Sequence, residues 1–172
     1  MVVRKIDDTV KEMYKAGLED ENFVMEAVEH TLGGKCEKST RNEDMYDHID
    51  FWWDSPKKGR IGIDVKGIKK SNRKDKIVDD SIHWIEIKNV RGNQGWIYGK
   101  SEYIAFRTFS KILFVKLIDL QKFAEEKIKG KELVFSNPKE FYIPYQRYGR
   151  KDMVFKCPTS DLETLADFSI EC

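Results

Sequence analysis

Residues 48–66 read His-Ile-Asp-Phe-Trp-Trp-Asp-Ser-Pro-Lys-Lys-Gly-Arg-Ile-Gly-Ile-Asp-Val-Lys, which indicates two short β-strands joined by a tight turn. Successive side chains of a strand point to opposite faces of the sheet. The isoleucines and the valine of the second strand should therefore share one face, and Asp64 and Lys66 the other. In the first strand, Asp50 lies on the face opposite Phe51.

The turn determines which residues of the two strands face each other. With a loop over residues 55–59, Asp54 pairs with Arg60, and Asp50 then lies directly opposite Asp64. The Cβ atoms of such cross-strand neighbours are roughly 4.5–5.5 Å apart. The hairpin is therefore expected to gather two carboxylates and a lysine in one cluster, backed by an apolar layer.

This cluster has a defined chemical use. Two neighbouring carboxylates repel each other unless a cation lies between them. Mg²⁺ is usually held by one or two carboxylates and a substrate phosphate, and Mn²⁺ accepts similar oxygen ligands. A bound metal lowers the pKa of its water, and Lys66 could orient that water or stabilise developing charge. The hypothesis is metal-dependent phosphodiester hydrolysis by Asp50, Asp64 and Lys66. The alternative is an ordinary hairpin with a solvated face.

Helical patterns precede the hairpin. The apolar spacing predicts a helix over 21–32, separated at Gly17 from a shorter helix over 6–15. Two glutamates, Glu26 and Glu29, lie near the edge of the apolar stripe of the second helix. Either could reach a site on the sheet or face solvent, and Glu26 is the preferred candidate.

A third strand is predicted over 82–89, and it contains a second acid-x-Lys pattern in Glu86-Ile-Lys88. If this strand lies next to the second hairpin strand, its polar face extends the same cluster. Glu86 would then supply a further metal ligand, and Lys88 a substrate contact. The remaining predicted elements are strands over 103–107 and 111–117, short extended pieces over 132–135 and 141–144, and helices over 119–128 and 161–168.

Basic residues are concentrated beside the predicted site. The whole chain has 31 Lys+Arg and 30 Asp+Glu, a net charge of +1, yet residues 66–76 hold six basic residues and one acid. Such a loop suits a phosphate backbone, although it could also be merely solvated. The candidate nucleic-acid-binding residues are Lys69, Lys70, Arg73, Lys74 and Lys76, together with Lys100, which follows the segment 90–99 with its three glycines.

The length of the chain and its cysteines limit the classes of protein that remain possible. A chain of 172 residues is long enough for one domain with its own core. The three cysteines are odd in number and widely spaced, which fits neither a disulfide framework nor a zinc site. There is no apolar run of transmembrane length and no signal-peptide pattern. A cytoplasmic protein without a membrane partner is therefore expected.

The order of these elements and motifs resembles the PD-(D/E)xK nuclease superfamily, which includes type II restriction enzymes, archaeal Holliday junction resolvases and many phage nucleases. The resemblance covers roughly residues 20–120. Glu26 matches the acid on the early helix, and Asp50 in His-Ile-Asp-Phe-Trp matches the first strand acid. Asp64-Val-Lys66 matches the acid-x-Lys pair, and it fits the hairpin spacing better than the second candidate pair, Glu86 and Lys88.

The resemblance implies a single α/β domain over 1–172, with a central mixed β-sheet flanked by helices as in restriction endonucleases and a C-terminal elaboration over 121–172. It also implies an endonuclease that uses Mg²⁺ or Mn²⁺, held by Asp50, Asp64 and Glu86, to cut DNA. Branched and phage-replication DNA are among the candidate substrates.

Small members often form homodimers, and a phage-encoded member would act in the host cytoplasm. The alternative function is a non-catalytic nucleic-acid-binding or protein-interaction module that kept the fold.

Overall fold

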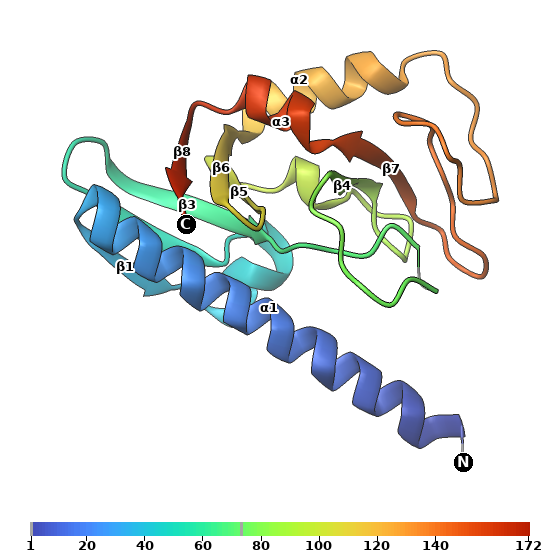
Figure 1. Ribbon diagram of the computed structural model, residues 1–172, viewed down its shortest axis with the longest axis horizontal. Helices are drawn as coiled ribbons and strands as arrows, with labels where there is room; N and C mark the ends of the chain where they lie inside the picture. Colours follow the sequence, from blue (N-terminus) through green and yellow to red (C-terminus); the bar gives the residue numbers. More distant parts are fainter. Residues whose placement is uncertain (1, 73) are drawn as a thin grey trace.

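The computed structural model describes residues 2–72 and 74–172, with side chains from residue 12 onward. Within these residues the chain forms a six-stranded sheet, a two-stranded sheet and three α-helices (Figure 1). The elements in chain order are α1 (Val2–Leu32), β1 (Lys35–Lys38), the π-helix η1 (Glu43–Asp47), β2 (Phe51–Ser55), β3 (Gly59–Lys66), β4 (Ile82–Lys88), the 3₁₀-helix η2 (Trp96–Tyr98), β5 (Tyr103–Arg107), β6 (Lys111–Lys116), α2 (Leu117–Ile128), β7 (Met153–Pro158), α3 (Thr159–Leu165) and β8 (Phe168–Glu171).

α1 is one continuous helix of 31 residues, so the break expected at Gly17 is wrong. One glycine in a helix interior costs only about 1 kcal/mol relative to alanine, which a long helix tolerates. The C-terminal half packs on the sheet through Val24 and Val28, both fully buried, whereas the N-terminal half extends beyond the sheet (Figure 1). The helix ends at Leu32, and the positive φ of 73° at the following Gly33 turns the chain toward β1.

The hairpin has the predicted register. β2 and β3 are antiparallel, with Asp54 opposite Arg60 and Phe51 opposite Ile63. The amide of Asp50 donates to the carbonyl of Ile63 at 2.9 Å, so the pairing continues one residue beyond β2. Ile63, the partner of Phe51, thus also holds Asp50, which places Asp50 beside Asp64 at the end of the hairpin without a regular pair between the two.

The main sheet is mixed, as expected, with the strand order β1-β2-β3-β5-β6-β8. β3 and β5 are parallel, and the other neighbours are antiparallel. The strand over 82–89 does not lie next to β3, so the condition for a shared polar face on one sheet is not met. β5 is the neighbour of β3 on that side, with Ile104 opposite Asp64. β4 instead pairs with β7 in the separate two-stranded sheet, and it lies within the crossover that connects β3 to β5.

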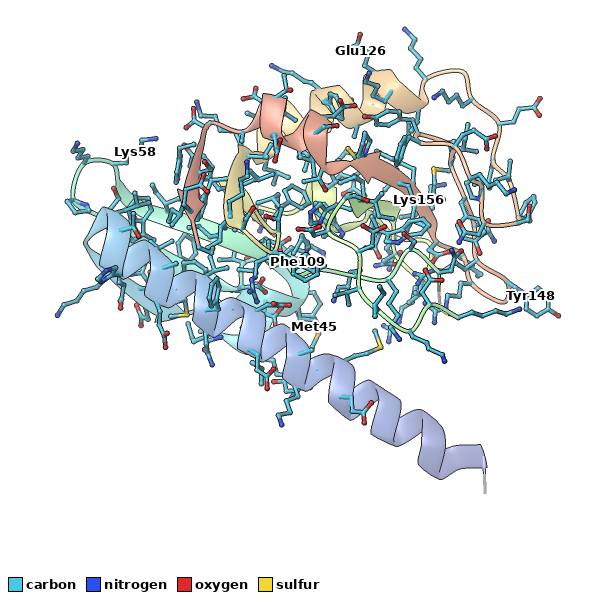
Figure 2. The ribbon with its side chains drawn as sticks, viewed as in Figure 1. Met45, Lys58, Phe109, Glu126, Tyr148 and Lys156 are labelled. Atoms are coloured by element: carbon cyan, nitrogen blue, oxygen red, sulfur yellow. The ribbon has the colours of Figure 1, made fainter. Side chains whose placement is uncertain are left out.

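The C-terminal part departs most from the sequence-based prediction. β7 and β8 were not predicted, and β8 begins at Phe168, where the last helix was expected to end. The extended pieces over 132–135 and 141–144 are reduced to an isolated bridge between Val134 and Tyr145. Between α2 and β7 the chain forms a long loop, and the fully exposed Tyr148 lies near its outer end (Figure 2).

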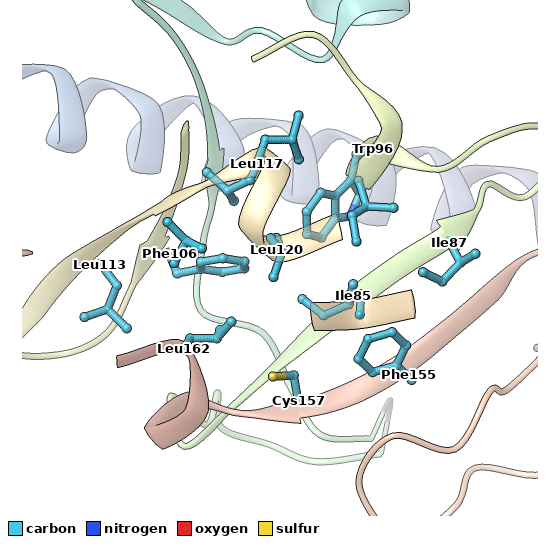
Figure 3. Packing of buried hydrophobic residues seen from close by; sticks show 14 residues of the cluster. Ile85, Ile87, Trp96, Phe106, Leu113, Leu117, Leu120, Phe155, Cys157 and Leu162 are labelled. Atoms are coloured by element: carbon cyan, nitrogen blue, oxygen red, sulfur yellow. The ribbon is translucent and has the colours of Figure 1, made fainter. Parts of the chain in front are cut away.

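Two apolar layers hold the sheet between its helices. On one face, α1 buries Phe51, Ile63 and their neighbours of β2 and β3. On the other face, β5 and β6 pack against α2, α3 and the β4–β7 pair, where Ile85, Phe155 and Leu162 meet (Figure 3). The structure is thus a mixed α/β domain with a central sheet flanked by helices. In the part of the chain described, none of the helices combines the length and the apolar character that a membrane span needs.

Candidate acidic site on the β2–β3 hairpin

The centre of the candidate site is the carboxyl group of Asp64, whose side chain is only 3% exposed. Its Oδ1 atom lies 2.6 Å from the Nζ atom of Lys66, two residues further along the same face of β3. Its Oδ2 atom is buried and has no hydrogen-bond partner among the described residues. Buried polar atoms are rarely left unpaired, so this oxygen marks a place where a proton or a cation would bind.

Asp50 faces Asp64 from the start of β2. One oxygen of Asp50, Oδ2, accepts a hydrogen bond of 2.6 Å from the amide of Val65, which fixes the carboxyl group over the hairpin. Burial raises the pKa of Asp64 well above its usual range, and Asp50 raises it further, whereas the attraction of Lys66 opposes the increase. When both carboxyl groups are ionised, neither can donate a hydrogen bond to the other. A proton on Asp64, or a cation between the two groups, would relieve that repulsion.

Lys66 remains a cation at neutral pH. Burial lowers the pKa of Lys66, but the charges of Asp64, Asp50 and Glu86 outweigh burial, so the pKa is raised overall. Its Nζ atom also lies 4.6 Å from the ring centroid of Trp96, a favourable cation–π geometry. A charged lysine in this position can neutralise an anion, but it has no free lone pair to act as a general base.

Glu86 reaches the cluster from a different sheet. It lies on the outward face of β4, where it is partly buried and accepts a hydrogen bond from the amide of Trp96. Burial raises the pKa of Glu86, while Lys66 and Arg147 oppose that increase. Lys88, the other member of this acid-x-Lys pattern, is exposed and contacts none of the cluster's carboxyl groups among the described side chains. The structure therefore brings Glu86 to the cluster but not Lys88.

The helix contributes Glu21 instead of Glu26, which corrects the sequence-based choice. Glu21 precedes the buried Val24 by three residues and shares its face, whereas Glu26 follows Val24 by two residues and is exposed on the opposite face. Burial raises the pKa of Glu21, and the negative charge of Asp50 raises it further, although a hydrogen bond from the Lys38 ammonium lowers it. Glu29, the other alternative, accepts a hydrogen bond from the Cys36 amide at 2.6 Å.

Two residues around Asp50 were not predicted. Asp44 belongs to the π-helix η1, and both burial and the charge of Asp50 raise its pKa. His48 follows η1 with a φ of 54°, a left-handed conformation that is uncommon outside glycine. Burial and the nearby Lys66 lower the pKa of His48, so the imidazole is neutral at pH 7. The sequence signal that could have identified them is their place in the polar segment directly before Asp50.

The basic loop leaves β3 directly after Lys66. Lys69, Lys70, Lys74 and Lys76 are all exposed, as phosphate contacts require, whereas Arg73 lies outside the described residues. The loop is anchored because the indole Nε1 of Trp84 donates to the carbonyl of Lys70 at 3.2 Å. Lys100 lies elsewhere, beside η1, where its ammonium is 2.8 Å from the carboxylate of Asp47.

The donor set limits which metal could bind here. Across the described residues, no three His, Cys, Asp or Glu side chains converge closely enough to form a complete metal centre. Asp50 and Asp64 do provide two oxygen donors, one of them buried and unpaired. Mg²⁺ often binds to only one or two carboxylates and completes its shell with waters and a substrate phosphate. The pair therefore fits a hard divalent ion that is bound together with substrate.

Comparison of the chain with protein-family models, with curated proteins and with solved structures finds no significant match. The function is therefore inferred from the geometry of the site.

Proposed function

We propose that this protein is a metal-dependent endonuclease that hydrolyses the phosphodiester backbone of DNA. The observation that carries the proposal is the buried Oδ2 atom of Asp64, which has no partner among the described residues although the same carboxyl group pairs with Lys66 and interacts with Asp50. A buried carboxylate with one free oxygen is costly unless a proton or a cation binds to that oxygen. A divalent ion would relieve that cost and attract a phosphate at the same time.

Each residue of the cluster has a role in this chemistry. Asp50 and Asp64 would hold Mg²⁺ or Mn²⁺, which supplies an activated water and neutralises phosphate charge. Lys66, held by Asp64 and Trp96, stabilises negative charge that develops on the phosphate. Glu21 and Glu86 flank the pair and act on Asp50 and Lys66 through their charges, so they would orient metal-bound waters.

The order of the site residues supports a restriction-endonuclease-like arrangement. An acid on the first helix is followed by an acid at the start of one strand and by an acid-x-Lys pair on the next. The second of these strands lies in the interior of a mixed sheet, beside a parallel neighbour. With Glu21 in place of Glu26, this is the order that the PD-(D/E)xK resemblance implies.

A non-catalytic module is the second candidate, and one observation favours it. The contact of 2.6 Å between Asp64 and Lys66 is a complete ion pair, and a buried ion pair can be purely structural. In that case the protein could still bind nucleic acid through its basic loop, or another protein, without cutting DNA. Activity and metal binding separate the two functions.

The direct test is cleavage of supercoiled plasmid and of branched oligonucleotides, with Mg²⁺, with Mn²⁺ and with EDTA. We expect metal-dependent nicking that Asp64→Asn abolishes. Asp54→Asn is the matched control, because Asp54 lies on the same hairpin but is exposed and pairs with Arg60. Metal-independent cleavage, or full activity in Asp64→Asn, would contradict the proposal. No cleavage of any DNA, together with retained DNA binding, would favour the non-catalytic module.

A further inference from the structure

A second set of side chains lies on the outward face of the β4–β7 pair. There Trp84 is directly opposite Lys156 in the strand register. Lys156, which is labelled in Figure 2, is only 8% exposed, and its Nζ atom lies 5.9 Å from the ring centroid of Trp84. Within the described residues, the ammonium of Lys156 forms no hydrogen bond and no ion pair. Neither residue belongs to the acidic cluster, which consists of Asp50, Asp64, Lys66 and Glu86.

A lysine in this state is unusual. Protein covers most of the Lys156 side chain, and this burial lowers the pKa of its ammonium, while the charge of Glu140 acts in the opposite direction. The aliphatic part of the side chain is covered by protein, while the amino group keeps no protein acceptor. Such an amino group is complementary to an anionic group of a ligand.

The surroundings of Lys156 indicate what that ligand would be. The rings of Trp84 and Tyr145 lie 6.3 Å apart at an angle of 43°, so the face carries two neighbouring aromatic side chains. The basic loop after β3 contacts the same face through the hydrogen bond from Trp84 to the Lys70 carbonyl. An aromatic surface next to several cations is the combination by which proteins bind single-stranded nucleic acid.

Two loops border this face and meet each other. The side-chain amide of Asn137, in the loop between α2 and β7, donates to the carbonyl of Ser71 at 3.4 Å, and it also contacts Asn72 in the basic loop. The contact joins the two loops to each other. A flexible single strand can follow a bordered surface of this kind more easily than a stiff duplex can.

The face is continuous with the acidic cluster. Glu86 is two residues from Trp84 on the same side of β4, a separation of roughly 6.8 Å along a strand. The charge of Glu86 acts in turn on Lys66. A DNA strand that crosses β4 from Trp84 toward Glu86 would therefore run toward Lys66 and Asp64 on β3.

We propose that Lys156 and Trp84 form a subsite for an unpaired nucleotide of the DNA strand that enters the acidic cluster. The ammonium of Lys156 contacts a phosphate, and the indole of Trp84, with Tyr145 beside it, contacts the base. This inference rests on the proposed function, and it specifies the substrate as DNA with a single-stranded segment next to the cleavage position.

Binding without metal tests the subsite separately from catalysis. The probes are fluorescein-labelled oligo(dT) and a duplex of the same length, titrated by anisotropy in EDTA so that no cleavage can occur. Lys156→Gln removes the charge and keeps most of the packing, and Trp84→Leu removes the aromatic ring. Lys122→Gln on α2 is the matched control, since Lys122 is an exposed lysine outside this face.

We expect the wild type to bind oligo(dT) more tightly than the duplex. Lys156→Gln should weaken oligo(dT) binding roughly tenfold, as expected for one charge-assisted contact, and lower the log–log salt slope by about 0.7. Trp84→Leu should weaken binding with little change in the slope, and Lys122→Gln should leave both unchanged.

Equal affinity of wild type and Lys156→Gln for oligo(dT), or a preference for the duplex that Lys156→Gln does not alter, would overturn the subsite. Circular dichroism and melting curves of each variant exclude misfolding as the cause of lost binding, and Lys156→Arg, which restores the charge, should recover affinity. If the subsite is confirmed while the plasmid assay shows no metal-dependent cleavage, the endonuclease proposal fails and the binding surface stands.

Discussion

The Nζ atom of Lys66 lies 2.6 Å from Oδ1 of Asp64, and Oδ2 of the same carboxyl group has no partner among the described residues. One oxygen of this carboxylate therefore has an ionic partner, and the other oxygen has none among the described residues. Asp50 approaches the same carboxyl group and adds to its repulsion. Two ionised carboxyl groups in this arrangement would destabilise the fold locally, and a divalent cation would remove that repulsion.

The two helix glutamates allow a paired test of the site. Glu21→Gln should lower metal-dependent cleavage roughly 10- to 100-fold, the range seen when groups around metal ligands are removed. Glu26→Gln, on the opposite exposed face of α1, should leave cleavage unchanged. Cleavage rates of the two variants over a range of Mg²⁺ concentrations measure the difference. A larger loss in Glu26→Gln than in Glu21→Gln would mean that the helix acid has been wrongly assigned.

Gly95 allows η2 to pack closely against β4. A substitution at Gly95 therefore tests whether the position of Trp96 over Lys66 is needed for metal binding. A Cβ atom at Gly95 would lie 2.2 Å from the carbonyl oxygen of Glu86, which is rigid backbone. Gly95→Ala should therefore lower the free energy of unfolding by about 1–3 kcal/mol and weaken Mn²⁺ binding. Gly17→Ala is the control, because nothing lies within 4 Å of its added Cβ atom.

Gly17→Ala should raise the free energy of unfolding by up to about 1 kcal/mol, since alanine favours a helix interior over glycine. Urea denaturation of both variants gives the two values. Equal stabilities for Gly95→Ala and wild type would show that the contact between η2 and β4 is looser than the structure indicates.

The buried His83 is expected to lower the free energy of unfolding in mild acid. Burial lowers its pKa to about 4, with Asp80 acting in the opposite direction, and its side chain packs edge-on against Phe106. Because the folded pKa lies below the ordinary value of 6.5, the contribution of His83 is complete above pH 6.5 and is lost as the pH falls toward 4. At 1.36 kcal/mol per pH unit, the loss amounts to about 3 kcal/mol.

The measurement is the free energy of unfolding of wild type and His83→Leu between pH 4 and pH 8. The wild type should lose stability relative to His83→Leu as the pH falls through this range. Parallel curves for the two proteins would show that His83 is not buried as a neutral group.

The basic loop is expected to make a salt-dependent contribution to DNA affinity. Replacing Lys70, Lys74 and Lys76 with glutamine should weaken binding to unrelated duplex sequences and lower the log–log salt slope by about two to three, at roughly 0.9 for each lost phosphate contact. Replacing the exposed Lys35, Lys122 and Lys129 makes a control of equal charge. If both triple variants lower the slope equally, the loop has no special role.

The hairpin could be predicted because its information is local. The alternation of residues 49–53 and 61–65, with a turn at Pro56 and Gly59, fixes both the register and the face of every side chain. The positions of Asp50, Asp64 and Lys66 followed directly from that pattern. The mixed α/β class followed as well, because long periodic segments of both types alternate along the chain.

The helix acid and the place of β4 could not be read in the same way. The choice between Glu21 and Glu26 depends on the rotation of α1 about its axis, which is set where Val24 and Val28 meet the sheet. The pairing of β3 with β5, and of β4 with β7, joins segments that are far apart in the chain. The local alternation of apolar and polar residues does not indicate which strands will pair over such distances. Glu86 nevertheless reaches the cluster because the crossover folds back over Lys66.

Titration calorimetry with Mn²⁺ tests the central claim most directly, on wild type, Asp64→Asn and the hairpin control Asp54→Asn. We predict that wild type and Asp54→Asn bind Mn²⁺ with the same affinity, whereas Asp64→Asn shows no binding. Asp64→Asn should also melt, in metal-free buffer, within about 2–4 °C of the wild type, because asparagine removes both the repulsion with Asp50 and the ion pair with Lys66. Absence of Mn²⁺ binding by the wild type, or binding by Asp64→Asn equal to that of the wild type, would contradict the assignment of Asp64 as a metal ligand.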